Sequence, residues 1–84
     1  MKKIRLTKHA IEQCCERGAT EDEVIGAIMH GEREQAKKGR LLCRYNYPFA
    51  RNWNGTYYPI KQVASVIKEE SNEIVVITVY TFFF

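Results

Sequence analysis

The sequence lacks the short motifs that mark the common nucleotide-binding and hydrolytic enzymes. Its 84 residues contain no G-x-G-x-x-G, no P-loop, no H-E-x-x-H and no nucleophile elbow. Each of these motifs places the reacting or ligand-binding groups of its enzyme class. Their absence removes support for nucleotide hydrolysis, for a zinc metalloprotease and for an α/β-hydrolase.

The number and spacing of the cysteines argue against both disulfides and metal. There are three cysteines, of which Cys14 and Cys15 are adjacent, and no C-x-x-C spacing occurs. Neighbouring cysteines rarely bridge each other, and zinc sites need spaced ligands. We therefore expect reduced thiols that act as small buried apolar side chains in a reducing compartment. The sequence predicts no metal and no cofactor.

No segment is long and apolar enough to span a bilayer. The longest uncharged apolar run, residues 74–84, has 11 residues, whereas a membrane helix needs about 20. The basic start Met1-Lys2-Lys3 is followed by no apolar segment of a signal peptide. We therefore expect a cytoplasmic protein without a membrane partner.

The run at residues 74–84 is β-branched and aromatic throughout. Such a run is typical of a strand that is covered on both faces, so we predict a central strand of a sheet. Its three final phenylalanines cannot all point inward, because side chains alternate along a strand. At least one needs a contact from elsewhere in the chain or from a second subunit, which leaves a homodimer open.

The first third of the chain predicts a helical hairpin. Residues 8–17 form the first helix, with Thr7 as N-cap and Gly18 after its last turn. Thr20 and Glu23 have the spacing of a capping box, which starts a second helix that ends near residue 30.

From residue 32 the hydrophobic period changes to two, which predicts strands. Four segments follow this period: residues 32–37, 40–47, 56–69 and 74–84. The turn at 38–39 and the loop at 48–55 separate the first three, and residues 3–6 form a short leading strand or an extended arm. The sum is a single α+β domain over residues 1–84. We expect the N-terminal helical hairpin to pack on one face of an antiparallel meander of about four strands.

Positive charge is concentrated in the middle of the chain. Residues 33–61 hold seven basic residues and one acid, and the same window carries six aromatic residues. Basic residues interleaved with aromatics suit a phosphate backbone and stackable bases. The candidate nucleic-acid-binding residues are Lys37, Lys38, Arg40, Arg44 and Arg51. The alternative is a solvated sheet face with ordinary core aromatics.

Three polar residues form a row beside the apolar face of the first helix. His9, Gln13 and Arg17 lie at i, i+4 and i+8. An imidazole moves protons near neutral pH, and a guanidinium holds phosphate through paired hydrogen bonds. Such a pair suits cleavage of a phosphodiester by the ribose 2′-OH, in which cations stabilise the charge on the phosphate oxygens. The alternative is an ordinary helical histidine and an arginine that pairs with a nearby glutamate or caps the helix.

Two further residues complete the catalytic candidates. Lys61 lies on the predicted strand 56–69, where it either pairs with a carboxylate across the sheet or stands at the rim of a cleft. Tyr80 lies in the last strand, where its hydroxyl needs a partner if buried. In this hypothesis His9 is the acid or base. Arg17, Arg44 and Lys61 hold phosphate, and Tyr80 orients the reacting group.

Several short motifs, in this order and spacing, resemble one bacterial family, catalogued as domain of unknown function 4258. The motifs are His9-Ala10, Arg17-Gly18, Glu23-Val24, Gly31-Glu32 and Ile77-Thr78-Val79-Tyr80. The stretches at residues 57–63 and 66–70 resemble a subgroup of that family. His9 and Arg17 match its most characteristic polar positions. Gln13 stands where members often have arginine, which removes one phosphate-binding cation from the row.

That family is similar to the RelE/ParE-type toxin superfamily. The resemblance implies helices packed on an antiparallel sheet, cleavage of messenger RNA, often on the ribosome, or inhibition of DNA gyrase, and an antitoxin partner. Two functions thus remain open. One is an RNA-binding toxin-like domain, with metal-independent endoribonuclease activity. The other is a non-catalytic interaction module that binds a protein or itself through an open sheet face or through residues 82–84.

Overall fold

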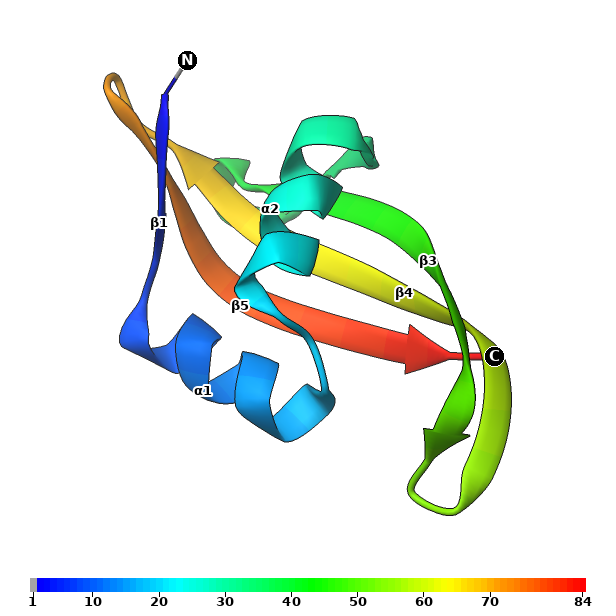
Figure 1. Cartoon of the computed structure of the whole chain (residues 1–84). Coiled ribbons are helices and arrows are strands. Elements are labelled where there is room, and N and C mark those ends of the chain that lie inside the picture. The colour runs from blue at the N-terminus through cyan, green and yellow to red at the C-terminus, as the bar shows by residue number, and fades with distance from the viewer. Residues whose placement is uncertain (1) are drawn as a thin grey trace.

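A computed structural model describes residues 2–84 as an α+β domain of two helices and a five-stranded sheet (Figure 1). The helices are α1 (Lys8–Arg17) and α2 (Glu21–His30). The strands are β1 (Lys3–Leu6), β2 (Glu32–Gln35), β3 (Leu41–Trp53), β4 (Thr56–Glu69) and β5 (Glu73–Phe83). A 3₁₀ turn, Lys37–Gly39, joins β2 to β3. The predicted fold class is confirmed, with five strands in place of about four.

Both helices begin and end where their capping residues predict. The Thr7 hydroxyl accepts from the Ala10 amide at 3.1 Å, and Gly18 ends α1 in the left-handed region at φ 72°. At the start of α2 both halves of the Thr20–Glu23 capping box are present. These local signals are enough to predict the helix ends, because each provides a hydrogen-bond partner for backbone groups that a helix end leaves unpaired.

The strand order is β1-β5-β4-β3-β2, so β5 is an interior strand between β1 and β4, as predicted, although β4 is the middle strand. The predicted cover on both faces of β5 is wrong, because Tyr80 and Phe82 are exposed. The strand β1 pairs in parallel with β5, so the sheet is mixed and not a pure antiparallel meander. Local sequence does not reveal a parallel pair whose strands are separated by most of the chain. This pairing ends at Val76, so the rest of β5 has a strand on one side only within residues 2–84.

The predicted loop at residues 48–55 is also wrong, because β3 continues through Pro48 to Trp53. Opposite Pro48, Ile60 exchanges both of its backbone hydrogen bonds with Phe84, at 2.9 and 3.1 Å. Pro48 and Ile60 therefore form a pair without mutual hydrogen bonds, and the Pro48 nitrogen points to the sheet edge. A proline is tolerated there. A bulge follows before Arg51, and the β3–β4 hairpin extends beyond the helices (Figure 1).

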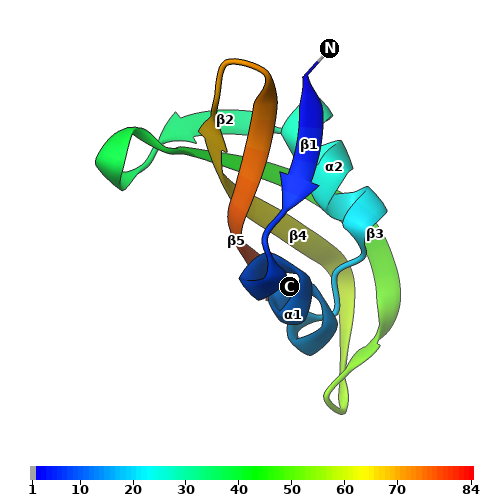
Figure 2. The same cartoon turned by 90° about the vertical axis from the view of Figure 1, so that its left-hand side faces the viewer.

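Both helices cover the same face of the sheet, here called the helix face (Figures 1 and 2). Its core side chains come from α1, α2 and three strands: Ala10, Cys14, Val24, Ala27, Ile28, Cys43, Val63, Ile67, Val76 and Val79. Burial raises the pKa of the Cys14 and Cys43 thiols, which favours their neutral form. Cys15 is exposed, which corrects the expectation that all three are buried.

The opposite face of the sheet, here called the open face, carries the side chains that alternate with this core. They are Leu42, Arg44, Asn46, Gln62, Ala64, Val66, Thr78, Tyr80 and Phe82. Neither helix lies over them (Figure 1). In residues 2–84, no helix combines the length and the apolar composition that crossing a membrane requires.

Candidate nucleic-acid interface

The aromatic side chains at the end of β5 point alternately to the two faces of the sheet. Phe83 points to the helix face, where its ring stacks on Trp53 at 5.0 Å between centroids and lies 5.1 Å from Phe49. Tyr80 and Phe82 point to the open face and remain 42% and 46% exposed. The three phenylalanines do not all point inward, as the alternation of a strand predicts.

Each exposed ring on the open face lies against a guanidinium group. The Arg17 guanidinium carbon is 5.1 Å from the centroid of Tyr80, and that of Arg44 is 5.9 Å from the centroid of Phe82. These are cation–π distances. The two rings lie two residues apart on β5, about 7 Å along the strand. The open face therefore carries two adjacent aromatic platforms, each beside a cation.

Arg17 reaches this position from α1 while it also holds the edge of β5. Its Nη1 donates to the Val79 carbonyl at 2.7 Å, and the Gln13 amide oxygen accepts from the Val79 N–H at 2.9 Å. These two side chains occupy the backbone groups that the short β1 leaves unpaired. Gln13 is buried, and its role is structural. A guanidinium has five N–H groups, so Arg17 keeps donors for a ligand.

Lys61 lies on the helix face and is only 3% exposed. Its Nζ lies 2.9 Å from the Gly18 carbonyl oxygen and 2.8 Å from Oε1 of Glu23, and it sits 5.3 Å from the Phe49 ring. It therefore joins the end of α1 and the start of α2 to the sheet. The sequence predicted that Lys61 either pairs with a carboxylate across the sheet or stands at the rim of a cleft. Neither prediction is right, because Lys61 is buried and its carboxylate partner, Glu23, lies on helix α2.

Two of the four catalytic candidates, Arg17 and Tyr80, meet in the structure. Lys61 lies on the other face of the sheet, and His9 is exposed on the first turn of α1. His9 is two helical turns from Arg17, about 12 Å along the axis. The structure does not gather the four residues in one site.

The five nucleic-acid-binding candidates are also spread out. Arg44 is central on the open face, Arg40 lies between the 3₁₀ turn and β3, and Lys37 and Lys38 are exposed in that turn. Arg51 lies apart, near the tip of the β3–β4 hairpin, where its guanidinium stacks on Phe49 at 4.6 Å. Four of the five candidates therefore lie on the open face or near its end at the 3₁₀ turn.

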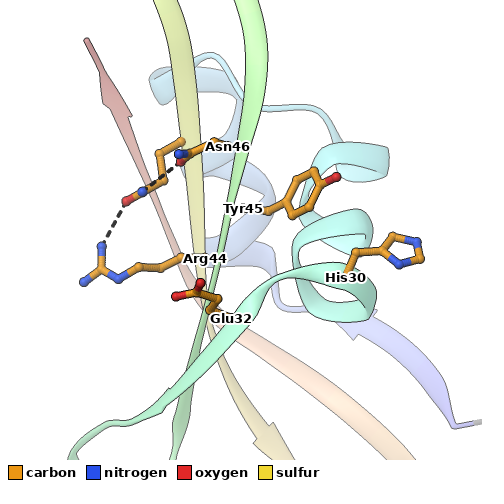
Figure 3. A pocket seen from close by; sticks show the side chains of 6 residues that line it. His30, Glu32, Arg44, Tyr45 and Asn46 are labelled. Carbon is orange, nitrogen blue, oxygen red and sulfur yellow. Dashed lines mark hydrogen bonds between the residues drawn. The ribbon is translucent and has the colours of Figure 1, made fainter.

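Beside Arg44 lies a polar hollow of about 380 Å³, at the point where β2 leaves β3 (Figure 3). It is lined by His30, Glu32, Arg44, Tyr45, Asn46 and Gln62. Figure 3 shows Arg44 and Asn46 on one side of β3, and Tyr45 and His30 on the other.

A chain of hydrogen bonds runs from Arg44 across the open face. Arg44 donates to Glu34 at 3.2 Å and to the Gln62 amide oxygen at 3.0 Å, and the Gln62 amide nitrogen donates to Asn46 at 2.9 Å. Sequence reasoning did not identify Asn46 and Gln62 as functional residues. The available signal was the alternation that places Asn46 on the same strand face as Arg44.

Comparisons of the chain with protein-family models, with curated proteins and with solved structures gave no match. The resemblance to domain of unknown function 4258 and to RelE/ParE-type toxins therefore stays a prediction. The candidate interface rests on its geometry alone.

Proposed function

We propose that this protein binds single-stranded RNA through the open face. The observation that carries the proposal is the pair of exposed rings, Tyr80 and Phe82, each beside a guanidinium. Proteins bind unpaired bases by stacking them on aromatic side chains of a sheet and by holding the phosphates with cations. The ring spacing of about 7 Å suits two successive unstacked nucleotides.

The positive charge of the protein also favours RNA as the ligand. The chain has a formal net charge of +3, and Lys37, Lys38 and Arg40 extend the positive charge beyond one end of the open face. Glu34 offsets the charge of Arg44, so these three residues and Arg17 supply the phosphate contacts. Because such contacts release counterions, binding weakens as the salt concentration rises.

Fluorescence anisotropy with a labelled single-stranded RNA of about 12 nucleotides tests the proposal, since this length lies within the site size of one small domain. Losing one stacked base costs about 1–3 kcal/mol, so Tyr80→Ala and Phe82→Ala should each weaken binding about 5- to 150-fold. Arg51→Ala is the matched control, because Arg51 lies away from the open face. It should change the affinity much less.

The proposal would be contradicted if the open face bound protein instead of RNA. If wild-type protein binds no RNA, but forms a dimer that Phe82→Ala dissociates in light scattering, the open face is a subunit interface. The non-catalytic interaction module is then the function.

A second candidate function is metal-independent cleavage of the bound RNA, and the contact between Arg17 and Tyr80 favours it. The phenol oxygen would accept a hydrogen bond from the ribose 2′-OH and orient it for attack on the phosphorus, and the guanidinium would stabilise charge on the phosphate. Water would take the 2′-OH proton and supply a proton to the leaving 5′-oxygen as the P–O5′ bond breaks. Such an activity would make this chain the toxin of a toxin–antitoxin pair, with an antitoxin protein over the open face.

The substitution Tyr80→Phe separates cleavage from binding, because it removes the hydroxyl and keeps the ring. Cleavage by wild-type protein in the presence of a metal chelator, lost in Tyr80→Phe with RNA affinity retained, would support the nuclease. Intact RNA after prolonged incubation with wild-type protein would leave a binding function only.

A further inference from the structure

Phe82, Gln62 and Asn46 form a row straight across the open face. Phe82 on β5 is opposite Gln62 on β4, and Gln62 is opposite Asn46 on β3. Two strand spacings separate the ends of the row, about 10 Å. A base stacked on Phe82 with its edge toward β3 therefore has the Asn46 amide ahead of it.

Hydrogen bonds fix the orientation of both amides. Arg44 has donors only, and Glu34 holds its guanidinium at 3.2 Å. The group that faces Arg44 must therefore be the oxygen of Gln62, at 3.0 Å, which directs the Gln62 nitrogen to the Asn46 oxygen at 2.9 Å. With its oxygen engaged in this way, Asn46 presents its two N–H donors outward.

We propose that Asn46 makes the open face selective for keto bases, uracil and guanine. The inference rests on the proposed function. Uracil and guanine carry an exocyclic oxygen that accepts from the Asn46 N–H groups. Cytosine and adenine carry an amino group at the corresponding position, which would set two donors against each other. Asn46 is exposed and lines the polar hollow, so a base edge has room to reach it (Figure 3).

The sharpest test compares two RNAs of about 12 nucleotides, one all uridine and one all cytidine, by anisotropy under the same salt. Both are pyrimidines, so their stacking on Tyr80 and Phe82 is similar and the affinity ratio isolates the base edge. A hydrogen-bond mismatch at one base costs about 1–3 kcal/mol. We expect wild-type protein to bind the uridine RNA about tenfold more tightly.

Variants of Asn46 should change this ratio in a defined way. Asn46→Ala should bring the ratio close to one. Asn46→Asp presents an acceptor in the same shape, so it should favour the cytidine RNA, although its charge weakens both affinities. Asn52→Ala, at an exposed asparagine near the hairpin tip, is the control and should keep the wild-type ratio.

The outcomes separate this inference from the proposed function. Equal binding of both RNAs by wild-type protein would overturn the keto preference and leave RNA binding standing. A uridine preference that survives in Asn46→Ala would also overturn the assignment to Asn46. Binding of neither RNA by folded wild-type protein would overturn the proposed function, and the inference with it.

Discussion

The two faces of the sheet carry similar pairs of residues that have different surroundings. On the helix face, Lys61 lies 5.3 Å from the Phe49 ring, is 3% exposed and pairs with Glu23. On the open face, Arg44 lies 5.9 Å from Phe82, whose ring is 46% exposed. The helices make the first pair part of the core, whereas the second pair can reach a ligand. Burial, and not residue type, separates the structural pair from the exposed pair here.

This difference in burial predicts that substitutions on the two faces affect different properties of the protein. Substitutions on the helix face remove buried contacts, which are expensive to lose, so they should lower the free energy of unfolding. Substitutions on the open face remove side chains that already contact water, so they should change binding and leave the stability nearly unchanged.

The largest effect is expected for Lys61→Ala. It removes a buried cation from the Glu23 carboxylate and the Gly18 carbonyl, and leaves the carboxylate with the Thr20 amide alone. We expect the free energy of unfolding, measured by urea denaturation, to fall by about 3 kcal/mol. Lys68→Ala, at an exposed lysine of the same strand, should cost less than about 0.5 kcal/mol. Equal small losses in both variants would mean that Lys61 is not buried.

The two neighbouring phenylalanines of β5 test the comparison most directly. Phe83→Ala removes a ring that contacts Phe49, Trp53 and Tyr58, and should cost about 2–3 kcal/mol. Phe82→Ala removes an exposed ring and should cost less than about 0.5 kcal/mol. Thermal and urea unfolding of the two variants measure the difference. A larger loss in Phe82→Ala would reverse the assignment of the two faces.

A smaller effect is expected at the edge of β5. Gln13→Ala removes the acceptor of the Val79 N–H, so the free energy of unfolding should fall by about 1–2 kcal/mol. The Val79 amide should also exchange with solvent faster in hydrogen-exchange NMR. Glu12→Ala, at an exposed position of the same helix, is the control. Unchanged Val79 exchange in Gln13→Ala would argue against the edge contact.

The smallest effect has the opposite sign. Ser65 is fully buried on the helix face, and its hydroxyl has no hydrogen-bond partner within residues 2–84. Since a buried polar group without a partner carries a desolvation cost, Ser65→Ala should raise the free energy of unfolding by up to about 1 kcal/mol. Ser71→Ala, in the exposed turn before β5, should change nothing. A loss of stability in Ser65→Ala would point to a partner for the hydroxyl.

Much of the fold could be predicted because its signals are local. Thr7, Gly18 and the Thr20–Glu23 box mark the helix ends. The exceptions depend on distant partners. The parallel pairing of β1 with β5 joins residues about 70 positions apart, and Pro48 stays in a strand because its nitrogen faces an edge.

The candidate site was predicted in its residue types and only partly in its arrangement. Alternation placed Leu42, Arg44 and Asn46 on one strand face, and the structure agrees. The sequence also predicted that Gln13 and Arg17 lie in one row on α1. It did not predict that both side chains would form hydrogen bonds with the Val79 backbone. Neither residue has a local signal for that contact.

The sequence by itself determined the helices, most strand positions and the alternation of side chains, because these follow from capping and from hydrophobic period. Only the tertiary structure decided which face of the sheet the helices cover. That choice buried Lys61 against Glu23 and left Tyr80 and Phe82 in contact with water. The physical reason is that burial depends on what packs above a residue, and those groups come from distant parts of the chain.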